Sequence, residues 1–235
     1  MNELMWVVML LTNFSLILIC YKIYGRMGLY LWIPISTIIA NIQVLKLVEI
    51  MGVEATLGNI VYASSFLATD ILSENHDRKD AKRAIGIGFL SLLSLTLLMQ
   101  MALKFTPSAN DFSQESLQTI FGLIPRIALA SIVAYIISQS HDIWAFHWIK
   151  EKTKGKKLWL RNCLSTMVSQ AIDTIVFIII AFWGMYEWSV LVEIFWTTYL
   201  LKWVVAAADT PFLYLARWMK KEGHDCPDQA PGHAL

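Results

Sequence analysis

The side chains with the greatest chemical capacity are polar and ionisable groups that interrupt long apolar stretches. Asn162, Thr166, Ser169 with Gln170, and Asp173 follow one another at positions i, i+4, i+7 and i+8, and i+11. This spacing places them on one face of a helix. A carboxylate within an apolar run is costly where it faces lipid, so this face is expected to line a cavity or another helix. We therefore interpret Asp173 and Gln170 as candidates for binding a polar solute.

Three more candidates lie in other apolar runs. Asn41 could hydrogen-bond a ligand or a neighbouring helix. Asp70 could bind a cationic group or a coupling proton, or it could be the fixed partner of an arginine such as Arg83. Gln139 lies at the inner end of its run, where its amide could contact a solute.

Lys202 is a basic residue inside the last apolar run. A buried lysine costs less when it pairs with an acid, and Asp173 and Asp70 are the candidate partners. The sequence leaves open whether such a pair would be structural or would control transport.

The composition indicates a membrane protein. Hydrophobic residues make up 57% of the 235 residues and charged residues only 16%, and the mean hydropathy is +0.54. Such values are typical of chains that cross a bilayer. The net charge of +1 gives no basic field for nucleic acid. The three cysteines lack metal-site spacing, and we predict no metal, no cofactor and no catalytic residue.

Seven apolar runs are long enough to cross a bilayer as helices. We expect an all-α bundle of about seven transmembrane helices in a single domain over residues 1–222, and a disordered cytoplasmic tail over residues 223–235. The runs are Leu4–Tyr21, Leu29–Ile50, Leu57–Leu72, Ile85–Lys104, Leu117–Gln139, Leu160–Trp183 and Val190–Trp218.

The basic residues alternate along this map. Of the 19 lysines and arginines, 15 fall in or beside the first, third and fifth connections and the tail. The second and sixth connections contain none. Because basic loops stay in the cytoplasm, we predict that the N-terminus lies outside and the C-terminus inside.

Four short motifs, in this order and spacing, resemble the queuosine precursor transporter family, which is also described as vitamin uptake transporter-like. They are Phe66–Glu74, with Asp70 at its centre, before a basic loop; Ala134-Tyr135 with Gln139 and Asp142; Asp173-Thr174 before an aromatic run; and Tyr199–Lys202 followed by Asp209-Thr210-Pro211.

The resemblance implies uptake of 7-deazaguanine precursors of the tRNA base queuosine across a bacterial cytoplasmic membrane. It also implies a fold similar to the substrate-binding components of energy-coupling-factor transporters, a six-helix core preceded here by one extra helix. Whether a separate energising module is needed stays open.

A deazaguanine presents an N–H and an amino group side by side, which match one carboxylate. Asp70 and Asp173 are the available carboxylates, and the neutral partners are Gln170, Gln139 and Asn41. Lys202 is a further candidate contact, at the end of the motif Tyr199–Lys202.

The residues alone indicate only a transporter of a small polar solute, so other functions stay open. The protein could carry another vitamin or nucleobase. A membrane enzyme would need clustered catalytic groups, whereas His141 and His147 do not share a helical face. A scaffold would not need the polar face that contains Asp173.

Overall fold

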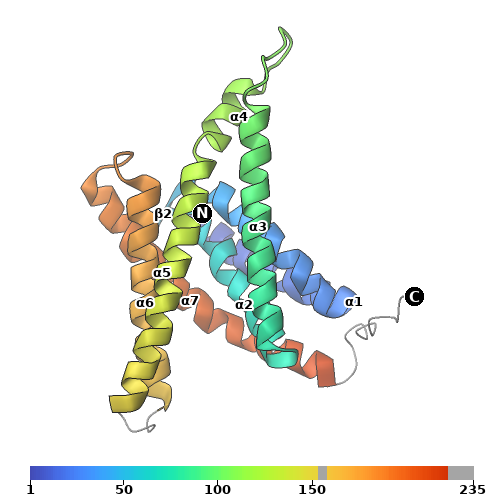
Figure 1. Ribbon diagram of the computed structural model, residues 1–235, viewed down its shortest axis with the longest axis vertical. Coiled ribbons are helices and arrows are strands. Elements are labelled where there is room, and N and C mark those ends of the chain that lie inside the picture. Colours follow the sequence, from blue (N-terminus) through green and yellow to red (C-terminus); the bar gives the residue numbers. More distant parts are fainter. Residues whose placement is uncertain (153–157, 222–235) are drawn as a thin grey trace. The chain divides into compact units, whose positions relative to one another are not determined.

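The computed structural model describes residues 1–152 and 158–221 (Figure 1). Within these ranges the chain forms two compact units. Unit 1 contains Met1–Thr106 together with the part of the chain that starts at Leu200, and unit 2 is Pro107–Tyr199. Each unit is described by itself below.

The first helix of unit 1, α1 (Asn2–Gln43), is two helices joined at a sharp kink. Gly25 has φ of 55° and ψ of −138°, a conformation that glycine adopts at low cost. A Cβ on Gly28 would lie 2.2 Å from the carbonyl oxygen of Cys20, so the chain folds back closely on itself at this point. The halves of α1 correspond to the first two predicted spans.

A two-stranded antiparallel hairpin follows α1, with β1 (Leu47–Ile50) paired to β2 (Val53–Thr56). Met51 and Gly52, which connect the strands, both have positive φ, as a tight two-residue hairpin turn requires. The second predicted span was therefore wrong at its end, because we expected helix to continue to Ile50. The Asn2 side chain donates to the carbonyl of Glu49 at 2.9 Å, which ties the start of α1 to the hairpin.

Two further helices, α2 (Asn59–Asn75) and α3 (Arg78–Ala102), pack against α1. Asp77 caps α3 by accepting a hydrogen bond from the backbone N–H of Lys79. Apolar side chains from α1, α2 and α3 form one core with residues near the end of α7 (Trp188–Lys221). The rings of Phe14 and Phe212, 4.7 Å apart, join α1 to α7 within unit 1.

Unit 2 contains the short helix α4 (Gln114–Phe121), then α5 (Ile124–Lys152) and α6 (Leu158–Phe182), together with the start of α7. We predicted one continuous span over Leu117–Gln139, but the helix breaks at Gly122 and Leu123. Pro125 explains the break, because proline lacks an N–H and fits only the first turn of a new helix.

The helices α5 and α6 lie side by side and pack together (Figure 1). The Arg126 side chain, at the start of α5, donates from Nε to the carbonyl of Ile180 at 2.6 Å and from its guanidinium to the carbonyl of Trp183. These carbonyls lie at the C-terminal end of α6, where helical acceptors lack intrahelical partners. Arg126 therefore holds the ends of the two helices together.

The predicted all-α membrane class is confirmed. Among the described residues, four helical stretches are long and apolar enough to cross a membrane: Asn2–Gln43, Lys79–Ala102, Gln114–Ser138, which includes the break between α4 and α5, and Trp188–Lys220. Met167–Phe182 is a shorter apolar helix. The predicted tail, residues 223–235, lies outside the described ranges.

Candidate functional site

A polar seam lies between α5 and α6, which we define as Ser138, His141, Ser169, Gln170 and Asp173. Asp173 is only 6% exposed. Its carboxylate accepts a hydrogen bond from the Ser138 hydroxyl at 3.3 Å. The Ser138 hydroxyl thereby joins α5 to α6 at a buried carboxyl group.

A second hydrogen bond crosses the seam between His141 and Ser169. The Nδ1 atom of His141 lies 3.0 Å from the Ser169 hydroxyl oxygen. Ser169 is buried, and the imidazole also contacts the Trp144 ring, with 5.7 Å between ring centroids. The seam therefore combines a carboxylate, two hydroxyls and an imidazole.

Gln170 contributes an acceptor that the fold does not use. Its Oε1 atom is buried and has no hydrogen-bond partner among the described residues. A buried polar atom without a partner costs about 1–3 kcal/mol. Such atoms usually have a functional explanation or bind a group that the folded chain alone does not supply.

Asp173 contacts the neighbouring helix α5 through Ser138, and Gln170 lies three residues before Asp173 on α6. That either residue contacts a solute stays a prediction. His141 was missed, because we considered it only together with His147, as a cluster that an enzyme would need. Its position three residues after Ser138 on the same helix was the available signal. The side chains of Gln139, Asn162 and Thr166 lie outside what the structure describes.

In unit 1, Lys202 is 7% exposed, and its Nζ lies 5.4 Å from the centre of the Tyr62 ring. A cation over an aromatic face is stabilised by the ring quadrupole. The contact joins α7 to α2. The predicted pairing of Lys202 with Asp173 or Asp70 stays a prediction.

The other unit 1 candidates occupy different settings. Asn41 is buried and donates to the carbonyl of Thr37, one turn earlier in the same helix, at 2.7 Å. Asp70 is exposed on α2 and near enough to Asp209 of α7 to interact with it electrostatically. Arg83, the arginine suggested as its partner, lies 3.9 Å from Asp80 instead.

Four side chains of α1 also bury a polar atom that has no hydrogen-bond partner within the described ranges. They are Nε1 of Trp6 and Trp32 and the side-chain oxygens of Asn13 and Gln43. Two donors and two acceptors on one folded-back helix make α1 a second region with unused hydrogen-bonding capacity.

No group of three or more His, Cys, Asp or Glu side chains that could hold a metal ion occurs within residues 1–152 and 158–221.

Comparison with known proteins assigns the chain to a family. A family model described as "Putative vitamin uptake transporter" matches residues 56–216. The "Probable queuosine precursor transporter" of Bacillus subtilis (strain 168) is 43% identical over 219 residues, which cover 93% of this chain and 96% of the relative. The chain belongs to the queuosine precursor transporter family. The resemblance found in the motifs is thereby confirmed.

More distant members of the queuosine precursor transporter family align over less of the chain. The "Queuosine precursor transporter" of Escherichia coli (strain K12) is 28% identical over 163 residues, 69% of this chain and 70% of the relative. The Haemophilus influenzae relative is also 28% identical, over 55% of this chain and 52% of its own length. No solved structure matches.

The family match covers the polar seam and leaves α1 outside the family model, which begins at residue 56. The Bacillus subtilis relative aligns with 93% of the chain and therefore extends into α1. The protein is a multi-pass membrane protein of a transporter family that handles small molecules.

Proposed function

We propose that this protein imports queuosine precursors, the 7-deazaguanine bases, across the bacterial cytoplasmic membrane. The observation that carries the proposal is the 43% identity to a queuosine precursor transporter over nearly the whole of both chains. The polar seam supports it, because it places hydrogen-bonding groups inside a pair of apolar helices.

The chemistry of the ligand fits the seam. A deazaguanine base offers an N–H and an adjacent amino group, which one carboxylate can accept together. In our proposal Asp173 accepts these donors and the unpartnered oxygen of Gln170 accepts another N–H. The imidazole of His141 and the Ser169 hydroxyl are placed to donate to the carbonyl oxygen of the base.

The remaining predicted contacts belong to the same proposal. Asn41, Asp70 and Lys202 lie in unit 1, and Gln139 lies on α5 in unit 2. We propose that they contact the base or its path. Asp70→Asn and Lys202→Met test this, since each removes the charge while keeping the length of the side chain close to the original.

We propose an outside N-terminus and a cytoplasmic C-terminus, on the alternation of basic connections. Cysteine substitutions at exposed Met51 and at exposed Lys79 test this orientation in whole cells. An impermeant maleimide should label position 51 and not position 79. The reverse labelling would overturn the proposed orientation.

The decisive experiment uses a bacterium that can neither make queuosine precursors nor import them. The chain is expressed there, each deazaguanine precursor is supplied at nanomolar concentration, and queuosine in tRNA is measured by the mobility of tRNA on a boronate affinity gel. We expect restored modification with at least one precursor. No restoration by any precursor, with the protein present in the membrane, would overturn the assignment.

Two variants connect this experiment to the seam, and the choice of expression host connects it to energy coupling. Asp173→Asn should reduce modification at limiting precursor, whereas exposed Glu187→Gln should not. Import by the chain expressed alone in a heterologous host would remove the need for a separate energising module. Import only after co-expression of host transport components would establish one.

Another vitamin or nucleobase is the second candidate cargo, favoured by the description of the matching family as vitamin uptake transporters. Competition distinguishes the two. Excess guanine or a pterin should leave precursor import unchanged under our proposal, and it should abolish import if the site is built for those compounds.

A further inference from the structure

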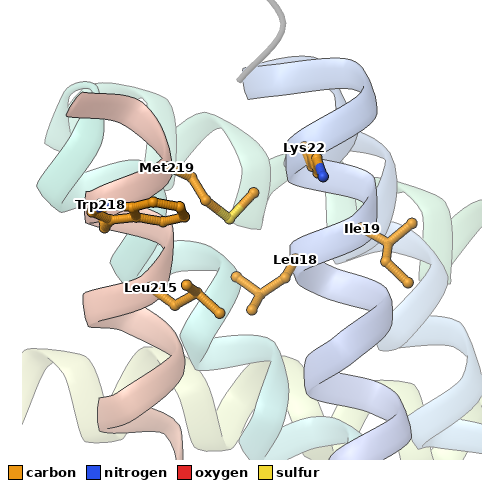
Figure 2. A pocket seen from close by; sticks show the side chains of 6 residues that line it. All are labelled: Leu18, Ile19, Lys22, Leu215, Trp218 and Met219. Carbon is orange, nitrogen blue, oxygen red and sulfur yellow. The ribbon is translucent and has the colours of Figure 1, made fainter. Parts of the chain in front are cut away.

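An apolar groove lies in unit 1 between the first half of α1 and the end of α7 (Figure 2). Its volume is about 350 Å³, at the low end of the range of small-molecule pockets. The residues that line it are Leu18, Ile19, Lys22, Leu215, Trp218 and Met219. None of them belongs to the polar seam or to the predicted substrate contacts.

The groove is open to the outer surface of the helices. Leu18 and Met219 form its floor and are nearly buried, whereas Ile19 and Leu215 are 49% and 44% exposed. Figure 2 shows Leu18 pointing from α1 towards Leu215 and Met219 of α7. An apolar slot that continues into an exposed apolar surface on membrane helices faces hydrocarbon chains rather than water.

One end of the groove carries a positive charge. Lys22 follows Leu18 by one turn of α1 and is exposed. Trp218 lies on the opposite wall and is half exposed. Tryptophan is enriched where the headgroups of a bilayer meet its hydrocarbon core, and a lysine at that level binds anionic headgroups.

Two acids of unit 1, Asp80 and Glu74, are paired with arginines rather than with Lys22. The guanidinium of Arg26 lies 3.3 Å from the Asp80 carboxylate, and that of Arg217 lies 3.2 Å from Glu74. Within the described ranges, Lys22 forms no ion pair. Its positive charge beside the apolar groove is one that a bound anion would balance.

We infer that the groove binds one anionic glycerophospholipid, with an acyl chain along Leu18, Ile19 and Leu215 and its phosphate at Lys22. Charge complementarity selects this occupant. A second copy of the chain would bring the same lysine to the interface, and like charges at an interface oppose association. A zwitterionic lipid would fill the apolar part but would neutralise less of the charge.

The test uses the purified full-length protein in a mild detergent with phosphatidylglycerol or phosphatidylcholine of identical acyl chains. Native mass spectrometry measures the fraction of protein that retains one lipid. We expect phosphatidylglycerol to be retained about fivefold more than phosphatidylcholine, because one lysine near an anionic headgroup contributes about that factor. Lys22→Gln should abolish the difference, and exposed Lys79→Gln on α3 should preserve it.

A second variant and a competitor separate the two parts of the ligand. Ile19→Trp fills the apolar slot and keeps Lys22, so it should reduce retention of both lipids while the helical content stays unchanged. Glycerol 3-phosphate at millimolar concentration should not displace the lipid, because it lacks an acyl chain. Equal retention of the two lipids, an unchanged preference in Lys22→Gln, displacement by glycerol 3-phosphate, or a protein dimer in place of the lipid adduct would each overturn the inference.

Discussion

The polar seam of unit 2 and the end of unit 1 around Asp80 both bury polar groups within apolar helices, but they satisfy them differently. At the Asp80 end, the carboxylate accepts from the Tyr30 hydroxyl at 2.9 Å and from Arg26 at 3.3 Å. Asn75 donates to Tyr21 and to the carbonyl of Ala216. In the seam, Ser138 and Ser169 supply neutral contacts, and Gln170 keeps an oxygen without a partner.

We propose that this difference separates polar groups that stabilise the fold from polar groups that bind a ligand. Paired charges and satisfied amides at the Asp80 end join α1, α3, α2 and α7 within one unit. An unsatisfied acceptor in the seam destabilises the empty protein and can be compensated by a bound donor. We therefore expect substitutions at the Asp80 end to lower stability, and those in the seam to lower binding.

The largest expected effect is on folding, at the bend of α1 near the Asp80 end. In Gly28→Ala, the new Cβ would lie 2.2 Å from the Cys20 carbonyl oxygen and 2.7 Å from its carbon. Both are backbone atoms, so α1 cannot keep its folded-back form. We expect almost no folded protein in the membrane, measured by size-exclusion profile after solubilisation.

Gly86→Ala is the matched control, because nothing lies within 4 Å of the added methyl group. It should be neutral or slightly stabilising, since alanine favours helix by about 1 kcal/mol. A monodisperse Gly28→Ala protein at normal yield would show that α1 does not fold back as described.

Asp80→Asn should lower stability by about 2–3 kcal/mol, because Arg26 loses its charged partner in a part-buried position. Thermal unfolding of the solubilised protein measures the loss. Import per folded molecule should stay unchanged. Asp77→Asn is the control, because asparagine caps a helix as well as aspartate does. A selective loss of import in Asp80→Asn would remove the distinction between the polar seam and the Asp80 end of unit 1.

Gln170→Leu should reduce precursor binding about tenfold, since a hydrogen bond to a buried acceptor of this kind contributes roughly 1.5 kcal/mol. The unfolding temperature should stay the same or rise, because an unsatisfied polar atom is removed. Isothermal titration with the precursor and thermal unfolding measure the two quantities. Exposed Gln118→Leu should change neither; destabilisation of Gln170→Leu would mean that Gln170 is structural.

Ser138→Ala should have the smallest effect, about a threefold loss of precursor affinity, because its 3.3 Å hydrogen bond orients Asp173 without contacting the base itself. Ser140→Ala is the control, since that exposed hydroxyl only bonds the carbonyl of Ile136. A loss in Ser138→Ala as large as that in Gln170→Leu would instead place Ser138 in contact with the ligand.

Much of the fold follows from hydropathy and helical spacing. The seven predicted runs correspond to the two halves of α1 and to α2, α3, α5, α6 and α7 within the described ranges. The observed elements differ from the predicted spans where backbone conformation overrides hydropathy. The apolar residues Val48 and Ile50 form a strand because Met51 and Gly52 adopt a tight turn, and Pro125 ends α4 before α5 begins.

The site was less predictable, because a sequence shows which polar groups share a face but not which remain unsatisfied. Asp173 and Gln170 were identified by their helical spacing. His141 and the unpartnered α1 atoms of Trp6 and Gln43 depend on contacts between elements distant in the chain. The hydrogen bond from Arg126 to the end of α6 likewise depends on contacts between helices and not on local sequence.

The central claim is that the polar seam binds a deazaguanine through Asp173. Equilibrium binding of a radiolabelled precursor to the purified wild-type protein and to Asp173→Asn tests it most directly. The account predicts binding by the wild type, at least a tenfold loss in Asp173→Asn because a charged acceptor is removed, and no comparable loss in Asp80→Asn. Equal affinity of the wild type and Asp173→Asn, with both proteins folded, would contradict it.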